Sequence, residues 1–210
     1  MFEHELETIC ARVEQLDDGD KRLLIAVAGP PAAGKSTLAE LLVDKLNTKT
    51  NGAAALVPMD GYHLDNAVLD QLNLRSRKGA PETFDAEGFL SLISSIAANE
   101  GDVHYPTFDR SNDCTVPNSA KVVADTRLVV VEGNYLLLDA PIWSQLKDHF
   151  DLTIFISPSL QVLEERLIQR WLEHGFDQSQ AEVKAHGNDI PNARTIVEGS
   201  TKADLQFTGG

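Results

Sequence analysis

Cysteine is scarce in this 210-residue chain, which has two, Cys10 and Cys114, in no metal-binding or redox spacing. Two such thiols give no support for a disulfide framework, so we expect both to be buried or idle in a reducing, cytoplasmic setting. No apolar run approaches the roughly 20 residues that a membrane helix needs, and the acidic start is unlike a secretory signal. These absences predict neither a membrane partner nor a targeting segment.

Basic residues are also few, because 18 Lys and Arg stand against 32 Asp and Glu and leave a net charge of −14. A nucleic-acid partner needs a basic footprint for its phosphates, so this balance argues against one. The length and the hydrophobic content of 42% fit one domain with a substantial core. We therefore expect residues 1–210 to form a single domain whose acidic surface favours solubility.

The apolar patterns predict an α/β fold with a doubly wound, mostly parallel sheet flanked by helices. Continuous apolar runs are typical of strands covered on both faces, and helical patterns follow them. The expected strands are 23–29, 53–59, 127–133 and 152–158, with a last one within 203–210. The expected helices are 37–47, 86–98 with Asp85 as its N-cap, 140–148 and 159–174. Residues 99–126, which contain Pro106 and Pro117, have the least regular pattern and are expected to form a substrate-side insertion.

An amphipathic helix is expected within residues 1–18, ahead of the first strand. Apolar residues recur there at spacings of four and three, namely Phe2, Leu6, Ile9, Val13 and Leu16. The stretch DDGD at 17–20 ends the pattern. This apolar stripe either packs on the domain's own surface or provides a homodimer contact.

A phosphate-binding loop is the strongest motif of the sequence. GPPAAGKS at 29–36 satisfies G-x-x-x-x-G-K-[ST] and lies between an expected strand and an expected helix. Backbone N–H groups of such a loop cradle phosphates, assisted by the positive end of the helix. Lys35 is expected to reach the β- and γ-phosphates of a nucleotide, and the Ser36 hydroxyl to bind Mg²⁺. The predicted nucleotide-binding residues are Gly29, Ala32, Ala33, Gly34, Lys35, Ser36 and Thr37, the last as a donor to the α-phosphate.

Two carboxylates are expected to face this loop. Glu132 closes the run LVVVEG, and Asp60 closes the second strand of a strand-helix-strand unit, so both emerge at the carboxyl edge of the sheet. Glu132 is expected to hold Mg²⁺ or its water shell, unless it is a solvated strand-end residue. Asp60 is expected either to accept the proton of an incoming hydroxyl during phosphoryl transfer or to bind a water molecule of the metal.

The residues that follow Asp60 are candidates for contact with a substrate. Gly61 permits a sharp exit from the strand, so Tyr62 and His63 can face a small molecule, although a structural role suits His63 equally well. A short basic group then interrupts the acidic chain, consisting of Arg75, Arg77 and Lys78. It indicates an anionic substrate, the developing charge of phosphoryl transfer, or a solvated loop.

Taken in order, GPPAAGKST, MDGYH, RKGAPETFD and VVVEGNYLLL resemble the phosphoribulokinase and uridine kinase family, whose members include bacterial pantothenate kinase. The resemblance extends from about residue 24 to 208. It implies an ATP-dependent, Mg²⁺-dependent kinase that phosphorylates a hydroxyl of a small metabolite such as a nucleoside, a pantothenate-like compound or a sugar. Asp60 matches the family's catalytic aspartate, and Glu132 matches its strand-end acid.

The same resemblance implies a lid at about 160–187 in which Arg166 and Arg170 close over the phosphates. These arginines are four positions apart and share one helical face, where ion pairs with nearby acids are the alternative role. The segment NDIPNAR resembles a family segment near the adenine, which makes Asn188 and Asn192 candidates for contact with the base.

In YPTFDRSND, the resemblance makes Tyr105, Asp109 and Arg110 candidates for substrate contact. The chain lacks the arginine-dense lid of uridine kinases and a clear pantothenate-specific set. The identity of the phosphate acceptor therefore stays open.

Three other functions are alternatives to the kinase. TKAD at 201–204 matches the guanine-reading motif of GTPase switches, but it precedes an expected strand, and no D-x-x-G stands at the switch position. The L-S-G-G-Q stretch of ABC-type ATPases is missing. A nucleotide-binding regulator of kinase fold without catalysis is disfavoured by four residues that occur together, Lys35, Ser36, Asp60 and Glu132.

Overall fold

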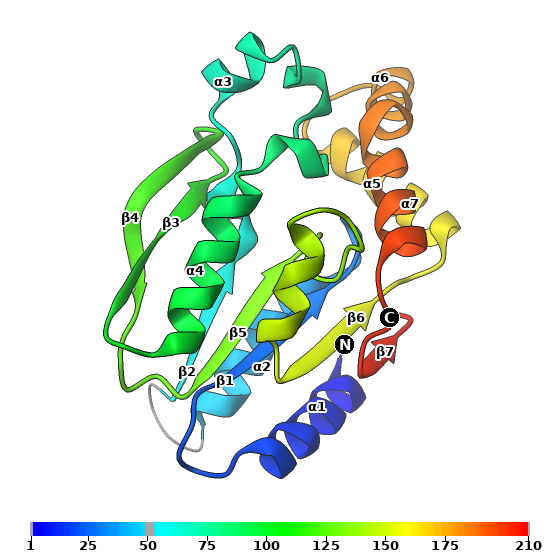
Figure 1. Cartoon of the computed structure of the whole chain (residues 1–210). Coiled ribbons are helices and arrows are strands. Elements are labelled where there is room, and N and C mark those ends of the chain that lie inside the picture. The colour runs from blue at the N-terminus through cyan, green and yellow to red at the C-terminus, as the bar shows by residue number, and fades with distance from the viewer. Residues whose placement is uncertain (1, 49–52, 210) are drawn as a thin grey trace.

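Five parallel strands form the central sheet of the computed structural model, which describes residues 2–48 and 53–209 (Figure 1). Their order across the sheet is β2 (Ala54–Pro58), β5 (Leu128–Gly133), β1 (Leu23–Ala28), β6 (Leu152–Ile156) and β7 (Leu205–Phe207). Strands β1 and β5 are buried along their whole length, as expected for strands covered on both faces. The predicted α/β fold and its five strands are thus confirmed.

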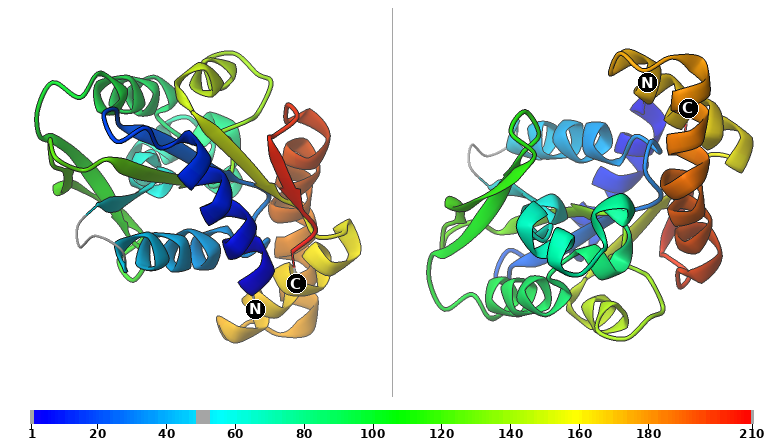
Figure 2. Two further views of the ribbon diagram at one scale, coloured as in Figure 1. Left: turned by 90° about the horizontal axis from the view of Figure 1, so that it is seen from below. Right: turned by 90° about the horizontal axis from the view of Figure 1, so that it is seen from above.

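Each face of the sheet has its own core, because successive side chains of a strand point to opposite faces. Leu23, Ile25 and Val27 belong to the core that includes α1 (Glu3–Leu16), α2 (Lys35–Asn47), α5 (Leu160–Glu173) and α7 (Ile190–Gly199). Leu24, Ala26 and Ala28 belong to the other core, which includes α4 (Ala86–Ala98) and the 3-10 helix η4 (Trp143–His149). Figure 2 shows α2 and α4 on opposite sides of the sheet.

The N-terminal helix α1 uses its apolar stripe within the chain. Leu6, Ile9 and Val13 are buried in the first core, which confirms that the stripe packs on the domain itself. Phe2 is also buried, and a Cβ placed on Gly34 of the phosphate loop would lie 2.9 Å from the Cζ atom of its ring. The helix therefore reaches from the sheet to the phosphate loop. Residues 1 and 210 of the predicted domain lie outside the described residues.

The segment 99–126, whose sequence pattern is the least regular, forms a β-hairpin instead of irregular chain, and its role as a substrate-side insertion stays a prediction. Strands β3 (Val103–Asp109) and β4 (Cys114–Val122) pair antiparallel in a sheet of their own. The pairing register shifts between Tyr105 and Thr107, at Pro106, and a two-stranded ribbon leaves one edge of each strand unpaired. Proline is tolerated at such irregularities and edges because no ladder hydrogen bond is lost there.

Short elements complete the carboxyl edge of the sheet. They are η1 (Met59–Tyr62), α3 (Asn66–Gln71), η2 (Arg75–Arg77), η3 (Pro81–Thr83), α6 (Gln178–Lys184) and the π-helical turn η5 (Ala185–Asp189). The helix expected at 140–148 is the 3-10 helix η4 at 143–149 instead of an α-helix. Asp85 caps α4 as predicted, because its side chain accepts a hydrogen bond from Gly88 N. Within the described part of the chain, no helix is long and apolar enough to cross a membrane.

A single buried arginine joins the hairpin to the sheet. Arg22, just before β1, is 7% exposed. Its guanidinium donates hydrogen bonds of 2.7–3.0 Å to four backbone carbonyls, those of Ile96, Val123, Ala124 and Thr126. These bonds fasten the end of α4 and the chain that returns from β4 to the start of the central strand.

Candidate active site

The carboxyl ends of β1, β2 and β5 deliver the predicted catalytic groups to one cavity of about 840 Å³. Lys35, Ser36, Asp60 and Glu132 all line this cavity. They come from three neighbouring strands, because β1 pairs with β5 and β5 pairs with β2. The parallel sheet thus brings together residues from three stretches that are far apart in sequence, as predicted.

The phosphate loop depends on glycine at its two ends. Gly29 has φ +151°, and a Cβ there would lie 2.2 Å from the carbonyl oxygen of Ile156 in β6. Gly34 has φ +92° and directly precedes α2, where Lys35 is the first residue. A side chain at either position would force the loop out of its turn. Of the other loop residues, Ala33 is buried in the core and Thr37 is exposed on the first turn of α2.

Lys35 and Glu132 form a buried pair at the base of the cavity. Lys35 Nζ lies 3.9 Å from Glu132 Oε1, and their side chains are 6% and 10% exposed. Burial lowers the pKa of Lys35 and raises the pKa of Glu132, while each charge opposes the shift of the other. A bound polyphosphate would stabilise the charged lysine, and a bound cation would stabilise the charged glutamate.

The oxygen donors beside Lys35 fit a magnesium ion. The Ser36 hydroxyl and the carboxylates of Glu132 and Asp60 line the same cavity. Among residues 2–48 and 53–209, no three His, Cys, Asp or Glu side chains gather as a metal-binding group. Mg²⁺ needs no such group, since it commonly takes one or two carboxylates together with substrate phosphates. Ser36 and Glu132 are therefore the residues that would hold it.

Asp60 lies where the hairpin meets the sheet. A Cβ on the neighbouring Gly61 would be 2.0 Å from the carbonyl oxygen of Pro106, so only glycine allows this close approach of η1 and β3. The approach brings Arg110 over the candidate catalytic carboxylate, with Nη2 2.8 Å from Asp60 Oδ2. The Arg110 side chain is 74% exposed, and that of Asp60 is 27% exposed. Arg110, expected to contact the substrate, thus pairs with Asp60.

His63 is held between two aromatic rings on the wall of the cavity. Its ring centroid lies 4.1 Å from that of Phe84 and 4.8 Å from that of Phe108. Burial lowers the pKa of His63 to about 4, so the imidazole is uncharged near neutral pH. The Nδ1 atom is buried without a hydrogen-bond partner. His63 is therefore packed as a structural residue and also lines the cavity, as both interpretations of the sequence required.

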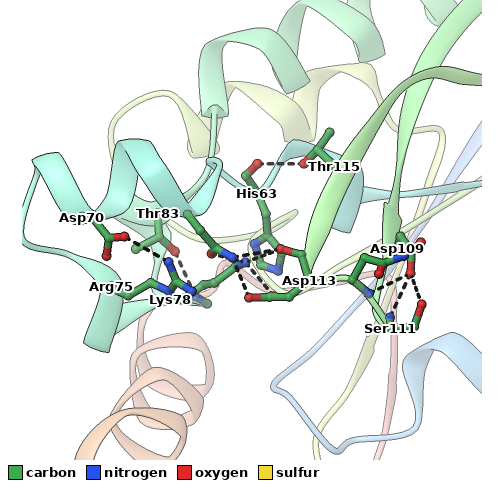
Figure 3. A network of polar contacts seen from close by, with 12 residues as sticks. His63, Asp70, Arg75, Lys78, Thr83, Asp109, Ser111, Asp113 and Thr115 are labelled. Carbon is green, nitrogen blue, oxygen red and sulfur yellow. Dashed lines mark hydrogen bonds and ion pairs between the residues drawn. The ribbon is translucent and has the colours of Figure 1, made fainter.

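The basic group after η1 also lines the cavity, and each of its members has a carboxylate partner. The pairs are Arg75 with Asp70 at 3.3 Å, Arg77 with Glu82 at 3.2 Å and Lys78 with Asp113 at 2.7 Å. Figure 3 shows the first and the third of these pairs in one network of polar contacts. The three basic side chains are thus neutralised by carboxylates of the protein, and they line the cavity and are not a fully solvated loop.

The two predicted lid arginines have different surroundings. Arg170 lines the cavity and lies 3.3 Å from Asp189, whose carboxylate also accepts a hydrogen bond from the Trp171 indole. Arg166 donates to the carbonyl of Ala32 in the phosphate loop at 3.3 Å and does not line the cavity. Arg166 therefore contacts the loop backbone, and Arg170 is the arginine that faces the open space.

The two asparagines of the predicted adenine side line the cavity next to each other. Asn192 donates to the side-chain oxygen of Asn188 at 3.2 Å, and Asn188 donates to the carbonyl of Lys78 at 2.8 Å. The second bond joins the turn η5 to the basic segment after η2. Asn188 thus bridges two walls of the cavity.

Three residues proposed for substrate contact have other roles. Tyr105 is 5% exposed, and its hydroxyl donates to the carbonyl of Leu56. Tyr62 packs against Phe89, and burial raises its pKa to about 12. Neither tyrosine lines the cavity, so this placement does not support their predicted contact with a substrate. Asp109 accepts four hydrogen bonds within its own turn, from Ser111 and Asn112, which lower its pKa to about 2.

Sequence reasoning missed five polar residues that line the cavity, namely Ser76, Asp113, Asn134, Lys184 and Asp189. Asn134 follows Glu132 by two positions, so the same strand-end argument would have found it. Asp113 belongs to the unpredicted hairpin. Asp189 follows Asn188 in a segment for which only asparagines were considered.

A cavity of this kind, lined by the phosphate loop and by two carboxylates at strand ends, is that of a P-loop kinase acting on small metabolites. A model of the phosphoribulokinase / uridine kinase family matches residues 24–185, and the chain belongs to this family.

Relatives of the chain agree with this membership. Protein YggC of Escherichia coli K12, which is uncharacterized, is 37% identical over 188 residues, covering 88% of this chain and 77% of that protein. A pantothenate kinase of Sinorhizobium medicae is 33% identical over 160 residues, covering 73% of this chain but only 47% of the kinase. The chain thus spans about half of that enzyme. A crystal structure from Silicibacter sp. TM1040, provisionally described as a fructose transport system kinase, has 42% identity and a TM-score of 0.90, covering 96% of this chain and 98% of that one.

Proposed function

We propose that the protein is an ATP- and Mg²⁺-dependent kinase that transfers the γ-phosphoryl group to a hydroxyl of a small metabolite, of the nucleoside, pantothenate-like or sugar type. The observation that carries the proposal is the single cavity that holds Lys35, Asp60 and Glu132 together. A phosphate site and a carboxylate that line one space are what a transfer between two bound substrates needs.

The phosphate loop and the lid bind and orient ATP. Backbone N–H groups of residues 32–36 and the Lys35 ammonium hold the β- and γ-phosphates, and we expect Asn188 and Asn192, which line the cavity, to contact the base. Ser36 and Glu132 would hold Mg²⁺, which when bound neutralises charge on the phosphate oxygens. Arg170, from α5, adds positive charge that offsets the negative charge of the transferring group.

Asp60 acts on the acceptor. The acceptor hydroxyl oxygen forms a bond to the γ-phosphorus while the bond from that phosphorus to the β–γ bridging oxygen breaks, which releases ADP. Asp60 Oδ accepts the hydroxyl proton. Arg110 donates to Oδ2 of that carboxylate at 2.8 Å, so Oδ1 is the oxygen that accepts the proton while the pair stays in place.

The test is ADP release with Mg-ATP in the presence of pantothenate, uridine, cytidine, ribulose 5-phosphate, fructose and related sugars. We expect one compound to stimulate release. In Asp60→Asn, turnover should fall roughly 10²-fold or more, the scale for loss of a general base, while ATP affinity stays within a few-fold. Unchanged turnover in this variant would show that Asp60 is not the base.

The regulatory alternative predicts a different result, namely that ATP binds and no compound stimulates ADP release. The GTPase alternative finds no support in the structure. Asp204 of TKAD accepts hydrogen bonds from Thr153 N and Oγ1 at 2.8 and 2.6 Å, and it directly precedes β7. It therefore lies at the amino end of a parallel strand, whereas the phosphate loop follows the carboxyl end of β1.

A further inference from the structure

We infer that the acceptor of this kinase is an uncharged hydroxylated compound rather than an anion. The inference rests on the proposed function and concerns the acceptor part of the cavity. We define this part by Asp60, His63, residues 75–79 and the hairpin residues Phe108, Arg110 and Asp113.

The positive charges of the acceptor part are already matched by carboxylates of the protein. Four cations and four carboxylates form the ion pairs Arg75–Asp70 at 3.3 Å, Arg77–Glu82 at 3.2 Å, Lys78–Asp113 at 2.7 Å and Arg110–Asp60 at 2.8 Å. The pairs sum to zero charge. The sequence left three roles open for the basic group. The ion pairs disfavour one of them, the binding of an anionic substrate.

Lys78 shows most clearly that the charge is used internally. Its side chain is 16% exposed, and its Nζ donates to Asp113 Oδ1 at 2.7 Å and to Asn66 Oδ1 at 2.8 Å. The Asp113 carbonyl at 3.3 Å accepts a third bond, which matches the three donors of an ammonium group. The ammonium also lies 5.0 Å from the centre of the Phe108 ring. A substrate anion would have to displace Asp113 from a lysine whose donors are all in use.

The backbone around Lys78 is held as firmly as its side chain. The Lys78 carbonyl accepts from Asn188 at 2.8 Å, and Gly79 N donates to Thr83 Oγ1 at 2.9 Å. The Tyr135 hydroxyl donates to the Gly79 carbonyl. Three hydrogen bonds thus fix the backbone of residues 78 and 79, which limits movement of the Lys78 side chain toward a different anion.

The rest of the wall suits hydroxyl groups. His63 is uncharged, and Phe108 presents an aromatic surface beside it. Hydroxyls can donate to the carboxylates of the ion pairs and accept from the ammonium and guanidinium groups, so they bind without breaking the pairs. An anion placed against an uncharged imidazole, with no cation released to it, would lose hydration without compensation.

The experiment compares compounds that differ only by a charged group. The pairs are pantothenol with pantothenate, glycerol with glycerate, ribose with ribose 5-phosphate, and uridine with uridine 5′-monophosphate. Binding to the whole chain is measured by calorimetry with Mg²⁺ and a non-hydrolysable ATP analogue. We expect the neutral member of at least one pair to bind about tenfold more tightly than its anionic partner, or better. The inference is overturned if no neutral member binds, or if the anion binds at least as tightly in each pair that shows binding.

ADP release with the same compounds separates this inference from the proposed function. Preferential phosphorylation of an anionic member would support the proposed kinase activity and overturn the inference that the acceptor is uncharged. Tighter binding of a neutral member without any ADP release would keep the preference of this part of the cavity for a neutral ligand and overturn the kinase.

A charge variant tests the cause of the selectivity. Asp113→Asn releases the charge of Lys78, and Asp113 is exposed with φ +51°, a conformation that asparagine adopts readily. We expect the affinity for the anionic member, relative to the neutral member, to rise about three- to tenfold. The matched control Asp102→Asn releases Lys121, which is paired at 2.8 Å on the same hairpin outside the cavity, and should leave the ratio within twofold. An unchanged ratio in Asp113→Asn, or an equal change in the control, overturns the inference.

Discussion

Glu132 and Asp113 hold a cation at opposite ends of one cavity, and they do so in different ways. Glu132 faces Lys35 from the end of a fully buried strand, and the pairing register places Glu132 beside Val27 just before the phosphate loop. Asp113 belongs to a hairpin outside the central sheet, its side chain is 51% exposed, and it meets Lys78 across 35 residues of sequence. The phosphate end is thus set by the core, and the acceptor end by loops that the core does not constrain.

The strongest way to break this comparison is Lys35→Met, which removes the charge at the phosphate end and keeps the shape of a 6%-exposed side chain. We expect kcat/KM to fall about 10²- to 10³-fold or more, because a preorganised donor to the transferring phosphate is lost. Lys45→Met, exposed on the last turn of the same helix, is the control. Activity of Lys35→Met within tenfold of the parent chain would exclude Lys35 from the transfer.

Gly61→Ala should separate the hairpin from the sheet. The added Cβ would lie 2.0 Å from the Pro106 carbonyl oxygen, so β3 must move away from Asp60. We expect the free energy of unfolding to fall by about 1–3 kcal/mol, the usual cost of overpacking, and acceptor affinity to fall more than ATP affinity. Gly187→Ala, where a Cβ meets nothing within 4 Å, is the control in urea denaturation. Equal losses of the two affinities would contradict an effect confined to the acceptor end.

His63 makes stability depend on pH at the acceptor end. Its pKa of about 4 in the folded chain lies below the ordinary 6.5, so the unfolded chain binds the proton first. Stability is therefore greatest above pH 6.5 and declines as the pH falls toward 4. Between pH 7 and 5 this residue should account for about 1–2 kcal/mol, which His63→Gln removes. Denaturation midpoints of both proteins at the two pH values provide the measurement, and parallel pH profiles would refute the assignment.

The smallest effect should come from the far end of the hairpin. Lys121 and Asp102 form an ion pair whose side chains are 48% and 42% exposed. Pairs of this kind contribute about 0–1 kcal/mol to stability. Lys121→Gln should therefore change the free energy of unfolding by less than about 0.5 kcal/mol and leave kcat and KM of the kinase reaction unchanged. A kinetic change would mean that the whole hairpin, rather than its tip beside Asp60, determines the acceptor site.

The sequence predicts the phosphate end well because its signals are local. The loop motif is contiguous, the apolar runs that precede Asp60 and Glu132 show that these residues end strands, and the rules for parallel sheets bring the strand ends together. The helices α2, α4 and α5 follow from their periodicity in the same way.

The acceptor end was predicted less well because its contacts are not local. Pro106 and Pro117 indicated irregular chain, although a two-stranded ribbon with a register shift accommodates both. Without the hairpin, Tyr105 looked available to a substrate, and the pairs Asp60–Arg110 and Lys78–Asp113 could not be foreseen. The sequence indicates most residues of the acceptor end, but it does not indicate their partners, because these depend on tertiary packing.

The hydrogen bonds of Arg22 resist acid and salt better than the ion pairs of the molecule do. Carbonyl groups neither titrate nor attract counter-ions as carboxylates do, so the four bonds of this buried guanidinium persist in acid and in concentrated salt. The pairs that position the hairpin tip weaken under the same conditions. Acid or salt should therefore first lower the affinity for the acceptor, while the base of the hairpin remains hydrogen-bonded to the start of the central strand.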